Sequence, residues 1–175
     1  MQLMNRLAAG DRDAISELYD RHAARVYALA HRILRNGTDA EDVVQEVFSQ
    51  AWRTAASYRA ERGSVTAWLL VMTRSRAIDR IRSRRMSEQA LDESGYQGLA
   101  SGEPPLTDEL IASERADSVR SALTQLPDDQ RRALELAYFE GLSQSEIAAK
   151  LRTPLGTVKT RIRAALATLR RSLRT

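Results

Sequence analysis

Residues 141–169 read GLSQSEIAAKLRTPLGTVKTRIRAALATL, and this stretch decides the fold because it contains two helix starts in close succession. Ser143 and Glu146 have the three-residue spacing of a capping box, in which two side chains satisfy backbone N–H groups at a helix start. Thr153 and Pro154 give a second start, an N-cap followed by a proline at the first helical position. The stretch therefore predicts two short helices joined by a tight turn, which is the geometry of a helix-turn-helix.

The second of these helices has one apolar face and one basic face. Its apolar residues recur at steps of three and four, at Leu155, Val158, Ile162, Leu166, Leu169 and Leu173. The side chains that we predict to face DNA are Thr157, Lys159, Thr160, Arg161, Arg163 and Ala164. Residues 159–174 contain six basic residues and no acidic residue. Such a face suits a phosphate backbone, whose neutralisation releases counterions, although a solvated amphipathic helix would show the same periodicity.

The composition indicates a helical protein without a metal or cofactor site. The chain has 175 residues, 43% of them hydrophobic, a net charge of +4 and no cysteine, which excludes disulfides and thiolate metal sites. His22 and His31 are nine residues apart, so they do not form an i, i+4 ligand pair. The acidic clusters lack a neighbouring nucleophile or a glycine-rich phosphate loop. We therefore expect no enzyme activity, no cofactor and no small-molecule substrate.

The rest of the chain predicts two small all-α domains joined by a flexible acidic linker. The first domain, residues 1–86, is expected to contain helices at 2–9, 13–34, 39–56 and 64–85, with Asp11 and Thr38 as N-caps and Glu41 completing a capping box at Thr38. Residues 87–109 are read as the linker, because residues 87–108 contain five acids and no Lys or Arg. The second domain, residues 110–175, is expected to add helices at 110–125 and 127–140 before the helix-turn-helix.

Two predicted helices of the first domain carry charged faces of opposite sign. Residues 39–52 place an apolar stripe on one side and leave exposed Asp42, Gln45, Glu46 and Ser49. Residues 74–85 contain six arginines and one acid, and the helical wheel exposes Arg76, Asp79, Arg80 and Ser83. An arginine row at this spacing suits a phosphate backbone. For the acidic face of residues 39–52, the alternative is a solvated surface without a partner protein. For Asp79, the alternative is a structural i±3 ion pair with Arg76 or Arg82 on the same helix.

Three motifs of this chain, in order, resemble those of the extracytoplasmic function (ECF) sigma factors, small bacterial factors of the sigma-70 type. Residues 39–53, DAEDVVQEVFSQAWR, and residues 63–85, GSVTAWLLVMTRSRAIDRIRSRR, look like two parts of region 2 of that family. Residues 126–162, LPDDQRRALELAYFEGLSQSEIAAKLRTPLGTVKTRI, look like region 4. The resemblance covers nearly the whole chain and implies a subunit that directs RNA polymerase to promoters.

The resemblance also implies partners and sites. It assigns Asp42, Gln45, Glu46 and Ser49 to contact with the β′ subunit of core RNA polymerase. It assigns two sets of residues to DNA binding at the promoter −10 element. The loop residues Tyr58, Arg59 and Arg62 would help to capture a flipped base, and the helix residues are Arg76, Asp79, Arg80 and Ser83. It places the recognition helix at the −35 element and implies control by an anti-sigma factor.

Two other functions are compatible with parts of the sequence. A free-standing helix-turn-helix regulator would bind promoter DNA as a dimer without polymerase, at half-sites about one helical turn apart. A pure protein-interaction module would have no salt-dependent DNA affinity. The longest apolar run, residues 67–72, is far shorter than the ~20 residues of a membrane span, and no signal peptide is recognised. We expect a cytoplasmic protein, which an anti-sigma partner could hold at the inner face of the membrane.

Overall fold

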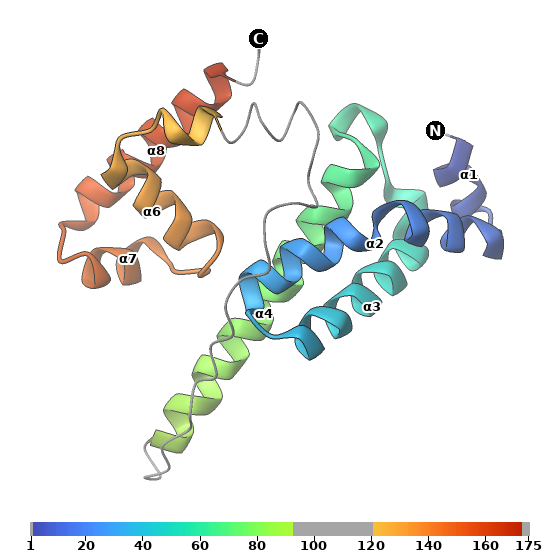
Figure 1. The fold of residues 1–175 in the computed structure, drawn as a ribbon, viewed down its shortest axis with the longest axis horizontal. Helices are drawn as coiled ribbons and strands as arrows, with labels where there is room; N and C mark the ends of the chain where they lie inside the picture. The colour runs from blue at the N-terminus through green and yellow to red at the C-terminus, as the bar shows by residue number, and fades with distance from the viewer. Residues whose placement is uncertain (1, 93–120, 173–175) are drawn as a thin grey trace. The chain divides into compact units, whose positions relative to one another are not determined.

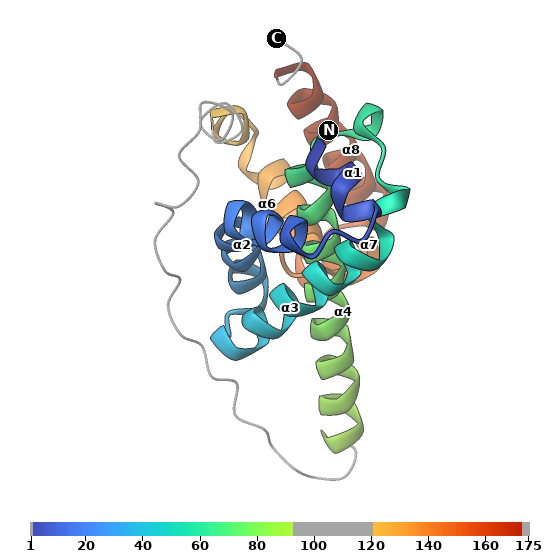
Figure 2. The same ribbon diagram turned by 90° about the vertical axis from the view of Figure 1, so that its right-hand side faces the viewer.

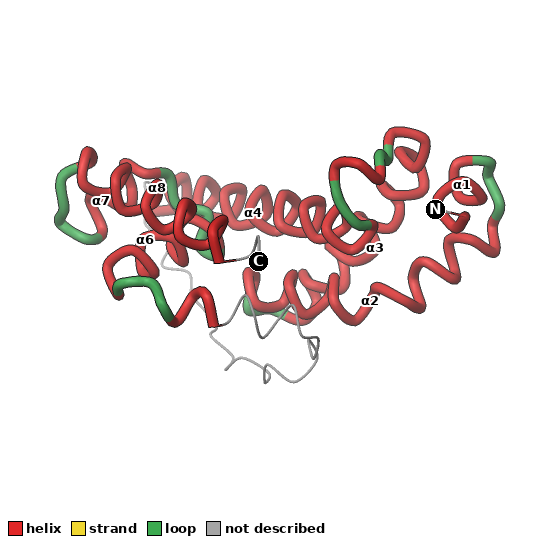
Figure 3. Tube along the Cα trace, turned by 90° about the horizontal axis from the view of Figure 1, so that it is seen from above, coloured by secondary structure: helices red, strands yellow, loops and turns green. Residues whose placement is uncertain are grey.

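The computed structural model describes residues 2–92 and 121–172, and over these residues it contains helices and loops and no strand (Figure 3). The prediction of an all-α fold is confirmed. The chain divides into two compact units, Met1–Leu110 and Ile111–Thr175. Because the placement of the two units relative to each other is not determined, each unit is described by itself.

The first unit is built on three long helices that pack against one another (Figures 1 and 2). They are α2 (Arg12–Leu34), α3 (Gly37–Thr54) and α4 (Val65–Asp92). The short helix α1 (Gln2–Ala8) packs on α2, and two 3-10 turns, η1 (Ala55–Ser57) and η2 (Ala60–Arg62), connect α3 to α4. Burial of the apolar stripes holds the three helices together, with the fully buried side chains Leu18, Val26, Val43, Val47 and Leu69 at the centre.

The helix starts of the first unit confirm the predicted cap at Asp11, show one at Ser64 and correct the one predicted at Thr38. Asp11 accepts a hydrogen bond from the Asp13 backbone N–H at 3.0 Å, and Ser64 Oγ accepts one from the Ala67 N–H at 3.2 Å. The prediction of Thr38 as the cap of the third helix is wrong, because Asn36 Oδ1 accepts from the Asp39 N–H at 2.9 Å and the helix begins at Gly37. Asparagine is among the best N-cap residues, and here it follows directly on the last turn of α2.

Two helix ends differ from the predicted ones. The third helix ends at Thr54 rather than at residue 56, and a 3-10 turn continues the chain. Helix α4 runs to Asp92 rather than to residue 85, so the first residues of the predicted linker, 87–92, are helical. The rest of the predicted linker, residues 93–109, lies outside the described residues.

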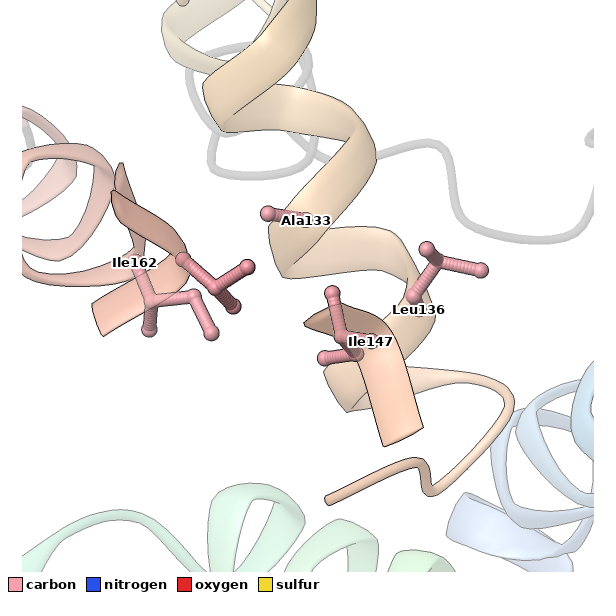
Figure 4. Close-up of a cluster of buried hydrophobic side chains, with 5 residues drawn as sticks. Ala133, Leu136, Ile147 and Ile162 are labelled. Carbon is pink, nitrogen blue, oxygen red and sulfur yellow. The ribbon is translucent and has the colours of Figure 1, made fainter. Parts of the chain in front are cut away.

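The second unit contains the helix-turn-helix. Its described helices are α6 (Asp128–Tyr138), α7 (Gln144–Lys150) and α8 (Leu155–Ser172). The predicted helix 110–125 lies mostly outside the described residues, although residues 121–124 are helical. A small core joins the three helices (Figure 4), made of the buried side chains Ala133, Leu136, Ile147, Val158 and Ile162.

The start of α7 is confirmed as predicted, and the start of α8 is shifted. The Ser143 N–H donates to Glu146 Oε2 at 2.6 Å and the Glu146 N–H donates to Ser143 Oγ at 3.3 Å, which completes the capping box. The prediction of Thr153 as an N-cap is wrong: its hydroxyl donates to the Leu151 carbonyl, and α8 begins at Leu155. The turn between the helices instead places Arg152 in the left-handed region, at φ 49°.

The apolar face of α8 is only partly buried. Val158 and Ile162 are in the core, whereas Leu155 and Leu166 are 38% and 50% exposed. The prediction that the whole stripe packs is therefore wrong for Leu155 and Leu166. Ala165, which is not part of the predicted stripe, is fully buried.

Candidate nucleic-acid and protein interfaces

The predicted polymerase-binding residues lie on one side of α3. Asp42, Gln45 and Ser49 are exposed, and Glu46 is partly buried. The apolar residues predicted for the opposite side are buried, including Val43, Val44 and Val47. The amphipathic pattern of the helix is thus realised, and it presents an acidic and polar surface at the side that faces away from the core.

The arginine row of α4 is not directed only to solvent, because three of its members, Arg76, Arg80 and Arg84, contact α3. Arg80 Nη1 lies 3.0 Å from Asp42 Oδ2, and Arg80 Nη2 lies 2.9 Å from Glu46 Oε1. Arg76 donates two hydrogen bonds to Gln50 Oε1, from Nε at 3.1 Å and Nη2 at 2.9 Å. The structure therefore brings together two sets of residues that the sequence analysis assigned to different partners.

A signal for this contact was present in the sequence. The acceptors on α3, Asp39, Glu46 and Gln50, are spaced i, i+7, i+11, and the arginines on α4, Arg76, Arg80 and Arg84, are spaced i, i+4, i+8. Each set occupies one side of a helix, and the two sets have matching chemistry. Reading the two helices as a pair, rather than one at a time, would have found it.

The outer side of α4 carries the other two predicted −10 residues. Asp79 and Ser83 are both exposed. They line a shallow hollow of the α4 surface together with Arg82, Met86 and Ser87. The exposed polar groups along this side of α4 include the Asp79 carboxylate and the Ser83 hydroxyl.

The loop between α3 and α4 is closed by Tyr58. Its phenol donates a hydrogen bond to the Gly63 carbonyl at 2.9 Å, and its ring lies 5.5 Å from the Trp68 ring, centroid to centroid. The Arg59 Nη1 donates to the Ala56 carbonyl at 2.7 Å. Arg59 and Arg62 are exposed, whereas Tyr58 is partly buried. The two arginines are therefore better placed than Tyr58 to meet a nucleic acid.

Removing the Tyr58 hydroxyl tests how this residue acts. We expect Tyr58→Phe to weaken binding of a single-stranded −10 oligonucleotide about threefold, because a hydrogen bond of ~1 kcal/mol that holds the loop closed is lost. If the ring instead stacks on a base, Tyr58→Phe keeps the ring and leaves the affinity unchanged. Fluorescence anisotropy measures the affinity, and Tyr27→Phe on α2 is the matched control.

His22 is a titratable side chain near this loop to which the sequence analysis assigned no binding role. His22 Nδ1 on α2 lies 3.4 Å from Thr66 Oγ1 at the start of α4. Burial lowers the pKa of His22 below its ordinary value, and the charges of Arg25 and Arg21 lower it further. His22 is therefore neutral at pH 7, and the positive charge at this edge of α2 comes from the two arginines.

The predicted DNA-facing residues of α8 fall into two groups. Thr157, Lys159, Thr160 and Arg163 are exposed. Arg161 and Ala164 are partly buried, and Arg161 Nε lies 2.8 Å from Asp129 Oδ2 on α6. Arg161 therefore contributes to the packing of α8 on α6, which the sequence analysis did not foresee. The exposed group forms a polar and basic surface on one side of the second helix of the helix-turn-helix.

Among residues 2–92 and 121–172, no group of three or more His, Cys, Asp or Glu side chains could hold a metal ion. Within the same described residues, no helix is long and apolar enough to cross a membrane.

Comparison with known families matches both units of the chain. The model of sigma-70 region 2 matches residues 18–86, and the model of sigma-70 region 4 matches residues 116–169. The chain is 39% identical to the ECF RNA polymerase sigma factor SigK of Mycobacterium ulcerans (strain Agy99), over 98% of this chain and 91% of the relative. It is 36% identical to the SigK of Mycobacterium tuberculosis (strain H37Rv), with the same coverage.

Solved structures with a similar chain include two complexes. CnrH in complex with the cytosolic domain of CnrY is 26% identical, with a TM-score of 0.44 over 98% of this chain and 94% of that chain. RpoE in complex with the anti-sigma factor NepR from Bartonella quintana is 24% identical, with a TM-score of 0.43 over 91% of this chain and 96% of that chain.

Proposed function

Because this chain belongs to the ECF RNA polymerase sigma factor family, we propose that it is an alternative sigma factor, which binds core RNA polymerase and directs transcription initiation at specific promoters. The observation that carries this proposal is the relationship over nearly the whole length of the chain, with region 2 and region 4 matched in the family's order. The family consists of initiation factors rather than catalytic enzymes, and we infer that this chain catalyses no reaction itself.

The exposed side of α3 is proposed as the polymerase contact. Asp42, Gln45 and Ser49 are exposed there and Glu46 is partly exposed, so a basic partner surface can approach them. Complementary charge accelerates docking and sets its register. In the family a basic coiled coil of the β′ subunit is the expected partner for this face.

Promoter recognition is proposed to use two surfaces. The −10 surface consists of the α3–α4 loop, with Arg59 and Arg62, and the outer side of α4, with Asp79 and Ser83. The −35 surface is the exposed side of α8, which would lie in the major groove as the second helix of a helix-turn-helix does. Its exposed residues, Thr157, Lys159, Thr160 and Arg163, combine hydroxyl groups with two positive charges.

Lys159 provides the cleaner test of the −35 surface, because Arg161 is held by Asp129. We expect Lys159→Ala to weaken binding of promoter duplexes about fivefold at low salt and to reduce the slope of log K against log [salt] by about 0.9, since one phosphate contact is lost. Arg132→Ala, on the exposed side of α6, removes the same charge and serves as the control. An equal effect of the two substitutions would show that only net charge matters and would remove Lys159 from the surface.

The proposed function as a whole is tested by mixing the purified chain with bacterial core RNA polymerase. Co-elution in gel filtration is expected, and the resulting holoenzyme should start transcription at promoters that core enzyme alone does not use. A chain that binds promoter duplexes tightly as a dimer and does not co-elute would instead be a free-standing regulator. We further propose a cytoplasmic location and an anti-sigma factor as the protein that restrains it, as the family membership suggests.

A further inference from the structure

The solvent-facing side of α2 carries four arginines that lie outside the proposed polymerase and promoter surfaces. Arg21, Arg25, Arg32 and Arg35 are all exposed. They follow one another at steps of four, seven and three residues, which are close to whole helical turns, so they share one side of the helix. Residues 21–38 contain no acidic residue. We call these four side chains the arginine stripe, and it gives this part of α2 a charge of one sign.

The stability of α2 accounts for only part of the arginine stripe. Arg32 lies in the last turn and Arg35 is the C-cap residue, where positive charge interacts favourably with the helix dipole. Arg21 pairs with Glu17 one turn earlier, but its side chain is still 60% exposed, and an exposed pair of this kind adds little to stability. Arg25 is in the middle of the helix, where the dipole effect is absent. The shared side of the four arginines therefore calls for an anionic partner.

The first half of the stripe lies beside the loop between α3 and α4. Helix α2 packs against α4 (Figure 1), and His22 Nδ1 lies 3.4 Å from Thr66 Oγ1 at the start of α4, directly after the loop. Burial is the main cause of the lowered pKa of His22, and the charges of Arg25 and Arg21 lower it further, so both guanidinium groups lie near this contact. The two arginines of the loop are exposed as well. The loop and the stripe thus form neighbouring basic surfaces.

We propose that the arginine stripe of α2 binds the phosphate backbone of the DNA that flanks the −10 element, as a DNA contact separate from the loop and from α4. The inference rests on the proposed function, which places the −10 element at the loop. Guanidinium groups suit this ligand, because each can donate two parallel hydrogen bonds to one phosphate. Ala24 is exposed and Ala28 is half-buried between the arginines, and these short side chains leave room for a sugar-phosphate chain to approach α2.

An acidic protein surface is the main competing partner, and the geometry of the stripe favours DNA. From Arg21 to Arg32 the helix rises about 16 Å. A phosphate backbone presents one charge about every 3.4 Å along the axis of each duplex strand, so it meets the stripe in any register. An acidic protein would need carboxylates at the spacing of these particular arginines. The neighbouring basic loop, which is proposed to bind DNA, also extends the same electrostatic surface.

Removing two charges of the stripe tests the inference. We expect Arg25→Gln combined with Arg35→Gln to weaken binding of a labelled DNA duplex of mixed sequence about tenfold at low salt. The slope of log K against log [salt] should fall by about 1.8 with the duplex, or by about 1.4 with a single strand, because two phosphate contacts are lost. Fluorescence anisotropy without polymerase measures both forms of DNA. A loss of slope with either form supports the stripe, and the form that shows it tells whether the strands are paired there.

The matched control removes two charges elsewhere in the first unit. Arg12 and Arg53 are exposed and lie outside the stripe, and Arg12→Gln combined with Arg53→Gln changes the net charge by the same amount. This control pair should lower the slope by less than about 0.5, because its charges are not in contact with phosphates.

A cross-linking measurement keeps all four arginines in place, so it decides if the variant at Arg25 and Arg35 does not fold. A photoreactive benzoylphenylalanine in place of Ala24, which is exposed within the stripe, should cross-link to labelled DNA on irradiation. The same group in place of Ser16, which is exposed on another side of α2, should not.

Specific outcomes would overturn the inference. If folded variants of the two arginine pairs lower the slope equally, or if neither does, the stripe is a solvated surface. An unchanged DNA affinity together with weaker co-elution with core polymerase would make the stripe a protein contact and would also overturn the inference. The DNA measurements contain no polymerase, so they fail independently of the proposed function: a wild-type chain that does not co-elute removes that function, whereas an unchanged salt slope removes the stripe.

Discussion

Reversing the charge of Asp42 and Glu46 together, by substitution with lysine, is expected to abolish co-elution of the chain with core RNA polymerase. The two carboxylates are exposed enough for a basic partner to reach them. Placing like charges opposite each other across an interface costs several kcal/mol, which corresponds to a loss of about a hundredfold or more in affinity. Gel filtration of the mixture, followed by a titration with labelled polymerase, measures the loss.

The ion pairs that Asp42 and Glu46 of α3 make with Arg80 of α4 determine which control this experiment needs. The reversed charges would also repel Arg80, which contacts both carboxylates, so a loss of binding could arise from disturbed packing. Gln45→Lys adds a positive charge to the same exposed side of α3 but leaves the ion pairs of Asp42 and Glu46 with Arg80 in place. It should weaken polymerase binding about tenfold. Asp20→Lys, on the exposed side of α2, is the matched control for charge, and circular dichroism reports the helix content of all variants. Retained polymerase binding in Gln45→Lys would return this side of α3 to the role of a solvated surface.

Substituting Ile147 by alanine is expected to unfold the second unit while leaving the first one folded. Ile147 of α7 is fully buried and belongs to one core cluster with Leu136 of α6 and Val158 of α8; Figure 4 shows it near Leu136. A large-to-small substitution in a core costs about 2–5 kcal/mol, and a unit this small has a stability of about the same size. Transcription from promoters with a −35 element should fall to background.

The design of the Ile147 experiment separates folding from binding. Ile147→Val removes one methylene and should cost only about 0.5–1.5 kcal/mol, so promoter use should persist. Co-elution with core polymerase should survive in both variants, because the proposed polymerase contact belongs to the first unit. Thermal unfolding followed by circular dichroism would show the loss of part of the helical signal at low temperature in Ile147→Ala. A single cooperative transition at the wild-type temperature would contradict the assigned role of this core.

Local signals predicted most of the helices, because their starts and apolar stripes depend on residues a few positions apart. The capping box at Ser143 and Glu146 and the cap at Asp11 formed as expected. The errors arose where two local signals compete. Asn36 and Thr38 both favour a helix start, and only the position of the preceding helix end selects Asn36. Similarly, the periodicity of α8 marks Leu155 and Leu166 as apolar but does not reveal that the small neighbouring core leaves them exposed.

The sequence by itself determined the all-α class, the helix-turn-helix and the family, since these depend on caps, periodicity and motif order along one chain. Only the tertiary structure decided which charged side chains are available to partners. A helical wheel does not show three contacts that occupy polar side chains in the structure. These are the ion pairs of Arg80 with Asp42 and Glu46, the ion pair of Arg161 with Asp129, and the hydrogen bond from the Tyr58 hydroxyl to the Gly63 carbonyl. The physical reason is that a helical wheel gives the direction of a side chain relative to its own helix, whereas ion pairing depends on the register and distance between two helices, which the packing of their apolar stripes sets.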